Sequence, residues 1–205
     1  MIPALVTLPT TVLDDGSVGL LARCVVALGG SRTVVVGAQR TDGGTSLDEF
    51  VVATAVAELA PDASVGIATQ VAAGRAASVI AREATTAELL GACEVVVLEG
   101  DAAACSDAAV IVSALFTRGQ HTIARGLEYV DGARNLPQPR RDGGPGIVWR
   151  DGGDLITLLD GTLARCGSVV TVVAGETMPS PVAGTLVELL CPVAAVRDLV
   201  ETLSA

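Results

Sequence analysis

Short apolar runs alternate along the chain with longer segments in which apolar residues recur at a helical spacing. The apolar runs predict buried strands at residues 4–8, 33–36, 65–71, 94–98, 147–149 and 169–173. The segments between them predict helices at residues 14–28, 46–59, 75–90, 106–117 and 155–164, followed by helical material at 186–203. Strands and helices in this alternation indicate an α/β fold with a parallel sheet and right-handed crossovers.

Polar residues at the ends of these segments support the assignments. Asp14 and Asp15 precede the first predicted helix, where a side-chain oxygen can cap the free amides. Ser46, with Glu49 three residues later, forms the capping-box pattern before the second predicted helix. Because no internal repeat or low-complexity linker divides these units, we expect a single domain over residues 1–205.

Composition indicates how the core is built. Hydrophobic residues make up 50% of the 205 residues, but aromatic residues make up only 2%. The chain is long enough for a substantial core, and that core must consist of many small aliphatic side chains. Side chains of this size suit helices that pack tightly on a parallel sheet.

The charge balance excludes several classes of function. The formal net charge is −10, and all 13 basic residues are arginine. Nucleic-acid binding is not expected, because neutralising phosphates needs a basic surface. The missing lysine excludes a Schiff-base enzyme and a Walker-type phosphate loop. No apolar run reaches the roughly 20 residues that span a bilayer, and the first residues lack the basic region of a signal peptide, so we expect a cytoplasmic protein without membrane contact.

The cysteines predict no metal site. They are widely spaced, five in number and without a CxxC pair, whereas zinc sites use closely spaced ligands. Most of them lie among apolar residues, which indicates buried, reduced thiols. They are Cys24, Cys93, Cys105, Cys166 and Cys191.

Residues 126–153 differ from the rest of the chain and contain its only tyrosine and its only tryptophan. The glycines and prolines of this stretch interrupt any continuous helix. The stretch ends in an apolar run at 146–149 followed by Arg150-Asp151-Gly152-Gly153, which predicts a strand entering a glycine-rich turn. A turn of this kind can bring backbone amides close to a bound anion.

The same region carries a resemblance to a known family. Its segments follow the order Leu115-Phe116-Thr117, Gly126-Leu127-Glu128-Tyr129, Asn135-Leu136-Pro137-Gln138-Pro139, Pro145-Gly146-Ile147-Val148-Trp149 and Gly152-Gly153. This order resembles the middle of the bacterial luciferase-like flavin/F420-dependent oxidoreductases. Residues 65–69 and 78–90 resemble the third strand and third helix of that family, so the resemblance covers roughly residues 60–155.

The resemblance implies a (β/α)8-type barrel. About 250 residues are typical of such barrels, so we expect this chain to form a shortened TIM-type (β/α) barrel with about six parallel strands. Six strands can close on themselves, leave an edge that a partner covers, or remain an open layered sheet. Because an uncovered edge invites association, we expect a homodimer.

Ligands of parallel barrels and open α/β sheets bind at the carboxyl ends of the strands. The resemblance implies that the ligand is a small-molecule cofactor, FMN or F420. The candidate cofactor-binding residues at these ends are Gln39, Arg40, Thr69, Gln70, Arg150, Gly152 and Gly153. The alternative for each is that a strand end reaches solvent and is polar for that reason alone.

Glu99 and Asp101 follow the fourth predicted strand and are the candidate catalytic residues. A buried carboxylate close to another has a raised pKa, which suits proton transfer. The family usually carries a glycine-rich segment at this place, and it frequently carries a functional histidine where this chain has Gln39.

These observations lead to three expectations. The first is a luciferase-like flavin- or F420-dependent oxidoreductase or monooxygenase, with its activity retained or lost. The second is a non-catalytic protein on the same scaffold that binds a flavin or forms homodimers. The third is an unrelated α/β domain, which would have helices on both faces of an open sheet.

Overall fold

The computed structural model describes residues 4–9, 18–28, 32–37, 48–71, 76–128, 146–159, 162–173 and 183–190. The helices in these ranges are α1 (Val18–Leu28), α2 (Glu49–Leu59), α3 (Ala77–Leu89) and α4 (Ala102–Glu128). The strands are β1 (Ala4–Pro9), β2 (Arg32–Gly37), β3 (Ser64–Gln70), β4 (Val95–Glu99), β5 (Gly146–Asp151), β6 (Asp154–Leu159), β7 (Thr162–Val173) and β8 (Thr185–Leu190).

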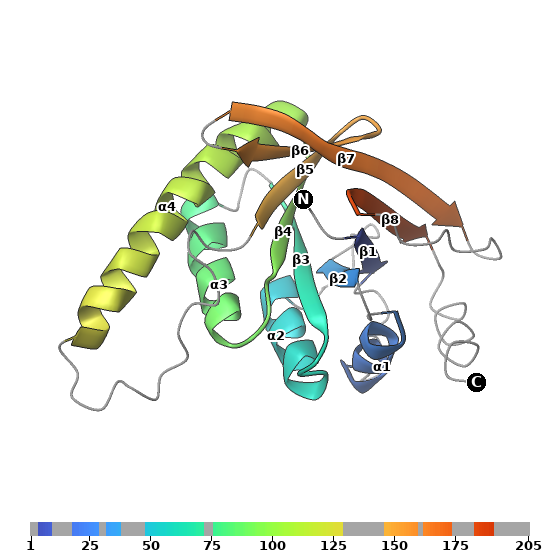
Figure 1. The fold of residues 1–205 in the computed structure, drawn as a ribbon, viewed down its shortest axis with the longest axis horizontal. Helices are drawn as coiled ribbons and strands as arrows, with labels where there is room; N and C mark the ends of the chain where they lie inside the picture. Colours follow the sequence, from blue (N-terminus) through green and yellow to red (C-terminus); the bar gives the residue numbers. More distant parts are fainter. Residues whose placement is uncertain are drawn as a thin grey trace.

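The strands form a closed barrel in the order β1 to β8 (Figure 1). β1 to β5 pair in parallel with one another, and β8 pairs in parallel with both β7 and β1. β6 pairs antiparallel with β5 and with β7, so it runs against the other described strands. The predicted α/β barrel is confirmed. Its predicted six parallel strands are wrong, and the strand-helix repeat of a TIM-type barrel stops at β5.

A tight hairpin between β5 and β6 causes this departure. Asp151 pairs with Asp154 across a two-residue glycine turn, and Gly152 has a φ of +59°, which glycine adopts without strain. The chain therefore reverses at once, and the helix predicted at 155–164 is instead β6 and the start of β7. The described part of the helical material predicted at 186–203 is also a strand, β8.

Side chains of each strand alternate between two apolar clusters. Outward-facing residues such as Val6 and Trp149 pack in a large cluster with the helices, and Figure 1 shows α1 to α4 lying beside one another along β1 to β5. Inward-facing residues fill the lumen of the barrel. They are Leu5, Val35, Ala68, Val95, Val97, Val148, Leu155 and Leu186.

Closure of the barrel removes the reason given for a homodimer. The described strands pair on both sides, so the barrel has no open edge for a second chain to cover.

Among the described helices, none combines the length and the apolar character that crossing a bilayer requires.

Candidate functional site

A layer of polar side chains lies at the carboxyl-terminal end of the barrel lumen, and we call it the mouth ring. Each member follows an inward-facing apolar residue by two positions, so strand alternation points it inward as well. The members are Thr7 on β1, Gln70 on β3, Glu99 on β4, Arg150 on β5, Thr171 on β7 and Glu188 on β8. β2 contributes Gly37, which has no side chain, to the same layer.

Gln70 and Glu99 are direct neighbours in the mouth ring. Their Cα atoms are partners in the pairing of β3 with β4, and the Gln70 amide donates a hydrogen bond of 2.7 Å to the Glu99 carboxylate. Burial raises the pKa of the Glu99 carboxyl above its usual 4.5. The Arg150 guanidinium and the Gln70 hydrogen bond oppose that shift, while the Glu188 and Glu49 carboxylates add to it.

An ion pair crosses the lumen between Arg150 and Glu188. β5 and β8 are not neighbours in the barrel, so the two side chains reach toward each other through the interior. The other carboxylate oxygen of Glu188 accepts a hydrogen bond of 3.4 Å from the Thr171 hydroxyl. The pair therefore links the two sides of the mouth ring.

Two polar atoms of the mouth ring are buried without a hydrogen-bond partner among the described residues. They are the Thr7 hydroxyl oxygen and the Arg150 Nε. Leaving a buried polar group unpaired costs about 1–3 kcal/mol. A bound molecule or an ordered water that satisfied both atoms would recover that free energy.

The structure brings three of the sequence-predicted residues together and separates the others. Gln70, Glu99 and Arg150 lie in the mouth ring, whereas Thr69 points outward and donates its hydroxyl hydrogen to the buried Glu49 carboxylate. Two further candidates, Gln39 and Arg40, lie outside the described residues.

The remaining candidates lie at the surface. Asp101 is exposed and caps α4, because its carboxylate accepts a hydrogen bond of 3.1 Å from the backbone amide of Ala104. Gly152 and Gly153 form the exposed β5–β6 turn, with open space where a Cβ atom would stand. A hairpin turn replaces the strand-to-helix turn that was predicted to hold an anion.

Sequence analysis missed Thr7, Thr171 and Glu188. Period-two alternation with Leu5, Val169 and Leu186 was the available signal. Glu188 could not be recognised as a strand residue because its segment was interpreted as helical.

Metal binding and thiol chemistry find no support in the described part of the chain. No group of three or more histidine, cysteine, aspartate or glutamate residues there could hold a metal ion. Cys24, Cys93 and Cys105 are free and buried, as predicted, and Cys166 is half-buried; Cys191 lies outside the described residues. Burial raises the pKa of Cys24 and of Cys105 to about 11, so both remain protonated near neutral pH.

The raised pKa of Glu99 predicts a pH-dependent cost to stability. The folded chain binds the Glu99 proton more tightly than the unfolded chain, so stability falls as pH rises from about 4.5 through the folded pKa. We expect Glu99→Gln to gain in free energy of unfolding relative to wild type over that interval. Urea unfolding followed by circular dichroism at a series of pH values measures the difference.

A second variant checks the cause of that pH dependence. Gln70→Leu removes the hydrogen bond that favours the ionised form of Glu99, so the Glu99 titration, followed by NMR, should move to higher pH. A stability difference between Glu99→Gln and wild type that stays constant with pH would contradict the prediction.

Comparison with known proteins identifies no family for this chain. No protein-family model matches the sequence, and no curated protein matches it. The function has to be inferred from the chemistry of the mouth ring.

Proposed function

We propose that the mouth ring holds the pyrimidinedione edge of a flavin or of the deazaflavin F420, and that the chain is a luciferase-like oxidoreductase or monooxygenase. One observation carries the proposal, which is the order of Gln70, Glu99 and Arg150 on the neighbouring strands β3, β4 and β5. An amide NH2, a carboxylate and a guanidinium form a donor-acceptor-donor row. The pyrimidinedione edge of both cofactors presents the matching row of carbonyl, N–H and carbonyl.

The residues present fit such a ring edge. The Gln70 amide uses one N–H on Glu99 and shows no partner for the other among the described residues, and a guanidinium has five N–H donors. At Gly37 a Cβ atom would lie 2.5 Å from the Cβ of Ala68, so the glycine lets β2 and β3 pack closely at this level of the barrel. The N–H donors of Gln70 and Arg150 therefore support the fit to the cofactor.

Residues of this chain would orient the ring and move one proton. A bound flavin or F420 supplies electron or hydride transfer. Gln70 and Arg150 hold the ring by its carbonyl edge, and the Glu99 carboxyl between them accepts the ring N–H. Burial raises the pKa of Glu99, which suits this carboxyl to proton transfer.

Equilibrium binding of FMN and of F420 to the purified chain tests this proposal, with fluorescence or calorimetry as the readout. Gln70→Leu should weaken binding of the preferred cofactor about tenfold, the value of a hydrogen bond of roughly 1.4 kcal/mol. Arg165→Met is a matched surface control, since Arg165 pairs with Asp154 outside the lumen. The proposal fails if neither cofactor binds, or if Gln70→Leu binds as tightly as wild type.

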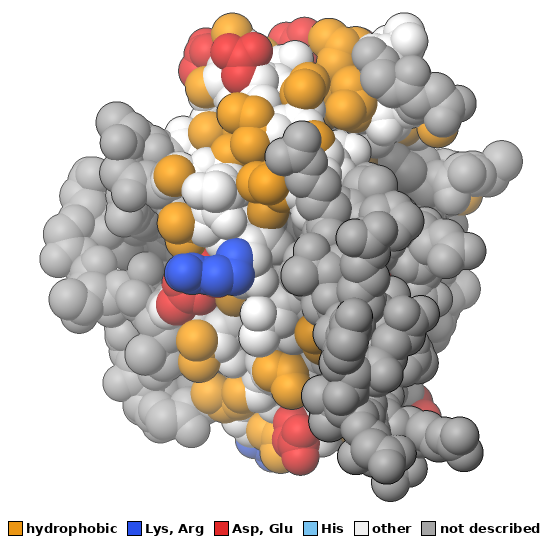
Figure 2. All heavy atoms as spheres, turned by 90° about the vertical axis from the view of Figure 1, so that its left-hand side faces the viewer, with side chains coloured by type: hydrophobic (Ala, Val, Ile, Leu, Met, Phe, Trp, Pro, Cys, Tyr) orange, Lys and Arg blue, Asp and Glu red, His pale blue; other side chains and the backbone are white. Residues whose placement is uncertain are grey.

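A second candidate function, homodimer formation, is favoured by the surface of α2 and α3. A groove of about 780 Å³ runs between these helices. Val51 and Leu90 line it and are more than half exposed, and Glu58 and Glu83 stand among its other lining residues. Figure 2 shows apolar side chains gathered in several places on the face that includes α3, with a basic group among them.

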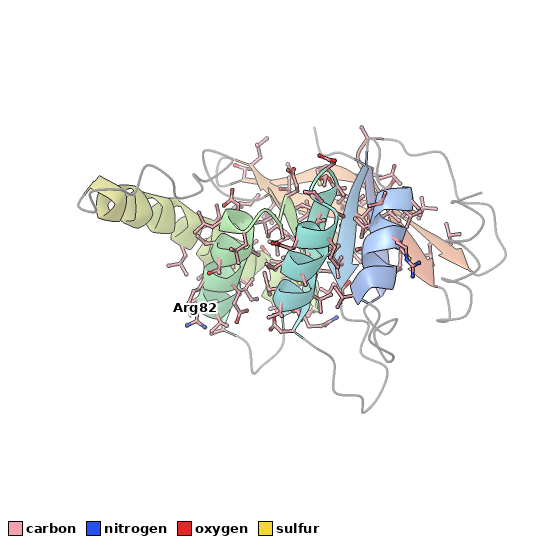
Figure 3. The ribbon with its side chains drawn as sticks, turned by 90° about the horizontal axis from the view of Figure 1, so that it is seen from below. Arg82 is labelled. Carbon is pink, nitrogen blue, oxygen red and sulfur yellow. The ribbon has the colours of Figure 1, made fainter. Side chains whose placement is uncertain are left out.

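Charge on this surface suits a two-fold contact. Arg82 projects outward from α3 in Figure 3, and an isologous contact could bring it to the Glu58 or Glu83 carboxylate of a second copy. Val51→Glu combined with Leu90→Glu should then convert a dimer to a monomer in sedimentation experiments. Val26→Glu, a similarly exposed apolar position on α1, should leave the assembly unchanged. A wild-type chain that sediments as a monomer at all concentrations would rule this function out.

A further inference from the structure

The Thr7 hydroxyl occupies an unusual position in the lumen. The side chain is about nine-tenths buried, with 8% of the residue exposed, and its oxygen has no hydrogen-bond partner among the described residues. Thr7 and Glu188 are partners in the pairing of β1 with β8. Valine would fill the same space without a polar atom, so the unpaired hydroxyl lowers the stability of the folded chain.

The Arg150 Nε is the second buried donor without a partner. The terminal nitrogen of the same guanidinium contacts the Glu188 carboxylate, so Thr7 and Arg150 are both neighbours of Glu188. Beneath them the lumen is filled by apolar side chains, among them Leu5 and Leu186. Two donors and one acceptor are therefore grouped above an apolar floor.

We propose that Thr7 and Arg150 form a subsite for a small uncharged carboxamide, and that Glu188 determines its preference for uncharged ligands over carboxylates. The carbonyl oxygen of the amide would accept hydrogen bonds from the Thr7 hydroxyl and the Arg150 Nε. Its N–H would donate to Glu188. An amide thus satisfies both unpaired atoms at once.

Charge explains the preference. Arg150 contributes one positive charge to the mouth ring, while Glu99 and Glu188 are two carboxyl groups, and the ion pair with Glu188 already neutralises the arginine. A carboxylate ligand would meet no uncompensated positive charge and would be repelled by Glu188. Replacing Glu188 by glutamine keeps its shape and frees the charge of Arg150, so the preference should reverse.

The subsite does not depend on the proposed cofactor, and its test uses the full chain without cofactor. Propionamide and propionate, which have the same shape and differ in charge, are titrated against the protein and followed by backbone NMR shifts near Thr7 and Glu188. Wild type should bind propionamide about tenfold more tightly than propionate, since an unpaired buried charge costs at least about 1.4 kcal/mol. Glu188→Gln should bind propionate the more tightly of the two.

Thr7→Val keeps the test decisive if Glu188→Gln does not fold. The valine variant should weaken propionamide binding about fivefold or more, by loss of one hydrogen bond, while its thermal unfolding midpoint stays equal to or above that of wild type. Equal binding of the two ligands to wild type would overturn the proposal. So would shifts that avoid Thr7 and Glu188, or unchanged propionamide affinity in Thr7→Val, which would indicate that the lumen holds only ordered water.

Discussion

Replacing Trp149 by alanine is expected to lower the free energy of unfolding by about 3–5 kcal/mol, the usual cost of removing a large buried aromatic side chain. Trp149 is only 2% exposed and belongs to the cluster between the barrel and the helices. The same cluster contains Cys105, Ala108 and Ala109 of α4. Its indole therefore holds α4 against β5, the strand that positions Arg150.

Urea unfolding followed by far-ultraviolet circular dichroism measures this loss, because the variant has no tryptophan to report by fluorescence. Val110→Ala on α4 is a suitable control: Val110 is about half exposed, so its truncation should change stability by less than about 0.5 kcal/mol. If Trp149→Ala lost less than about 1 kcal/mol, the packing of α4 on β5 would not be what fixes that side of the barrel.

The first five strands and four helices could be predicted because each is specified by local sequence. Val95 to Leu98 form an uninterrupted apolar run that is too short for a helix and therefore predicts a strand. The structure has β4 there. Helix ends were less predictable. The cap of α2 is Asp48, which accepts hydrogen bonds from the amides of Phe50 and Val51, whereas the predicted cap, Ser46, lies outside the described residues.

Of the last three strands, only the end of β7 was predicted, as the strand at 169–173. β6, the start of β7 and β8 were interpreted as helices. Leu155, Ile156, Leu158 and Leu159 fit a helical face as well as a strand. The deciding signal was the pair of glycines before them, which permits a two-residue hairpin. That signal was interpreted as a turn for an anion, so the chain direction after β5 was wrong.

The candidate site was partly predictable for the same reason. Gln70 and Glu99 end strands that were correctly identified, and period two separates Gln70, which points into the lumen, from Thr69, which points toward Glu49. Glu188 depends on β8, whose pairing with β1 and β7 no local pattern reveals. An ion pair across a barrel interior can therefore be identified only once the order and direction of the strands are known.

Replacing Arg150 by methionine should cost about 2–3 kcal/mol at neutral pH. Breaking a fully buried ion pair costs about 3–5 kcal/mol, since the remaining charge loses its partner. Here the Arg150 side chain is 33% exposed and that of Glu188 is 14% exposed, so solvent reduces the loss. The matched control is Arg165→Met, whose partner is Asp154 and whose side chain is 64% exposed, with an expected cost of at most about 1 kcal/mol.

The pH dependence of this loss distinguishes the charge of Arg150 from its packing. Arg150 lowers the pKa of Glu99 in the folded chain, so the methionine variant raises that pKa further above the unfolded value of about 4.5. The extra destabilisation should therefore grow as pH rises above about 4.5 and disappear at lower pH, where Glu99 is protonated in both states. Urea unfolding of wild type, Arg150→Met and Arg165→Met between pH 4 and 8 measures it. A loss that is independent of pH would mean that Arg150 acts through the packing of its aliphatic stem, and the mouth ring would then be no electrostatic unit.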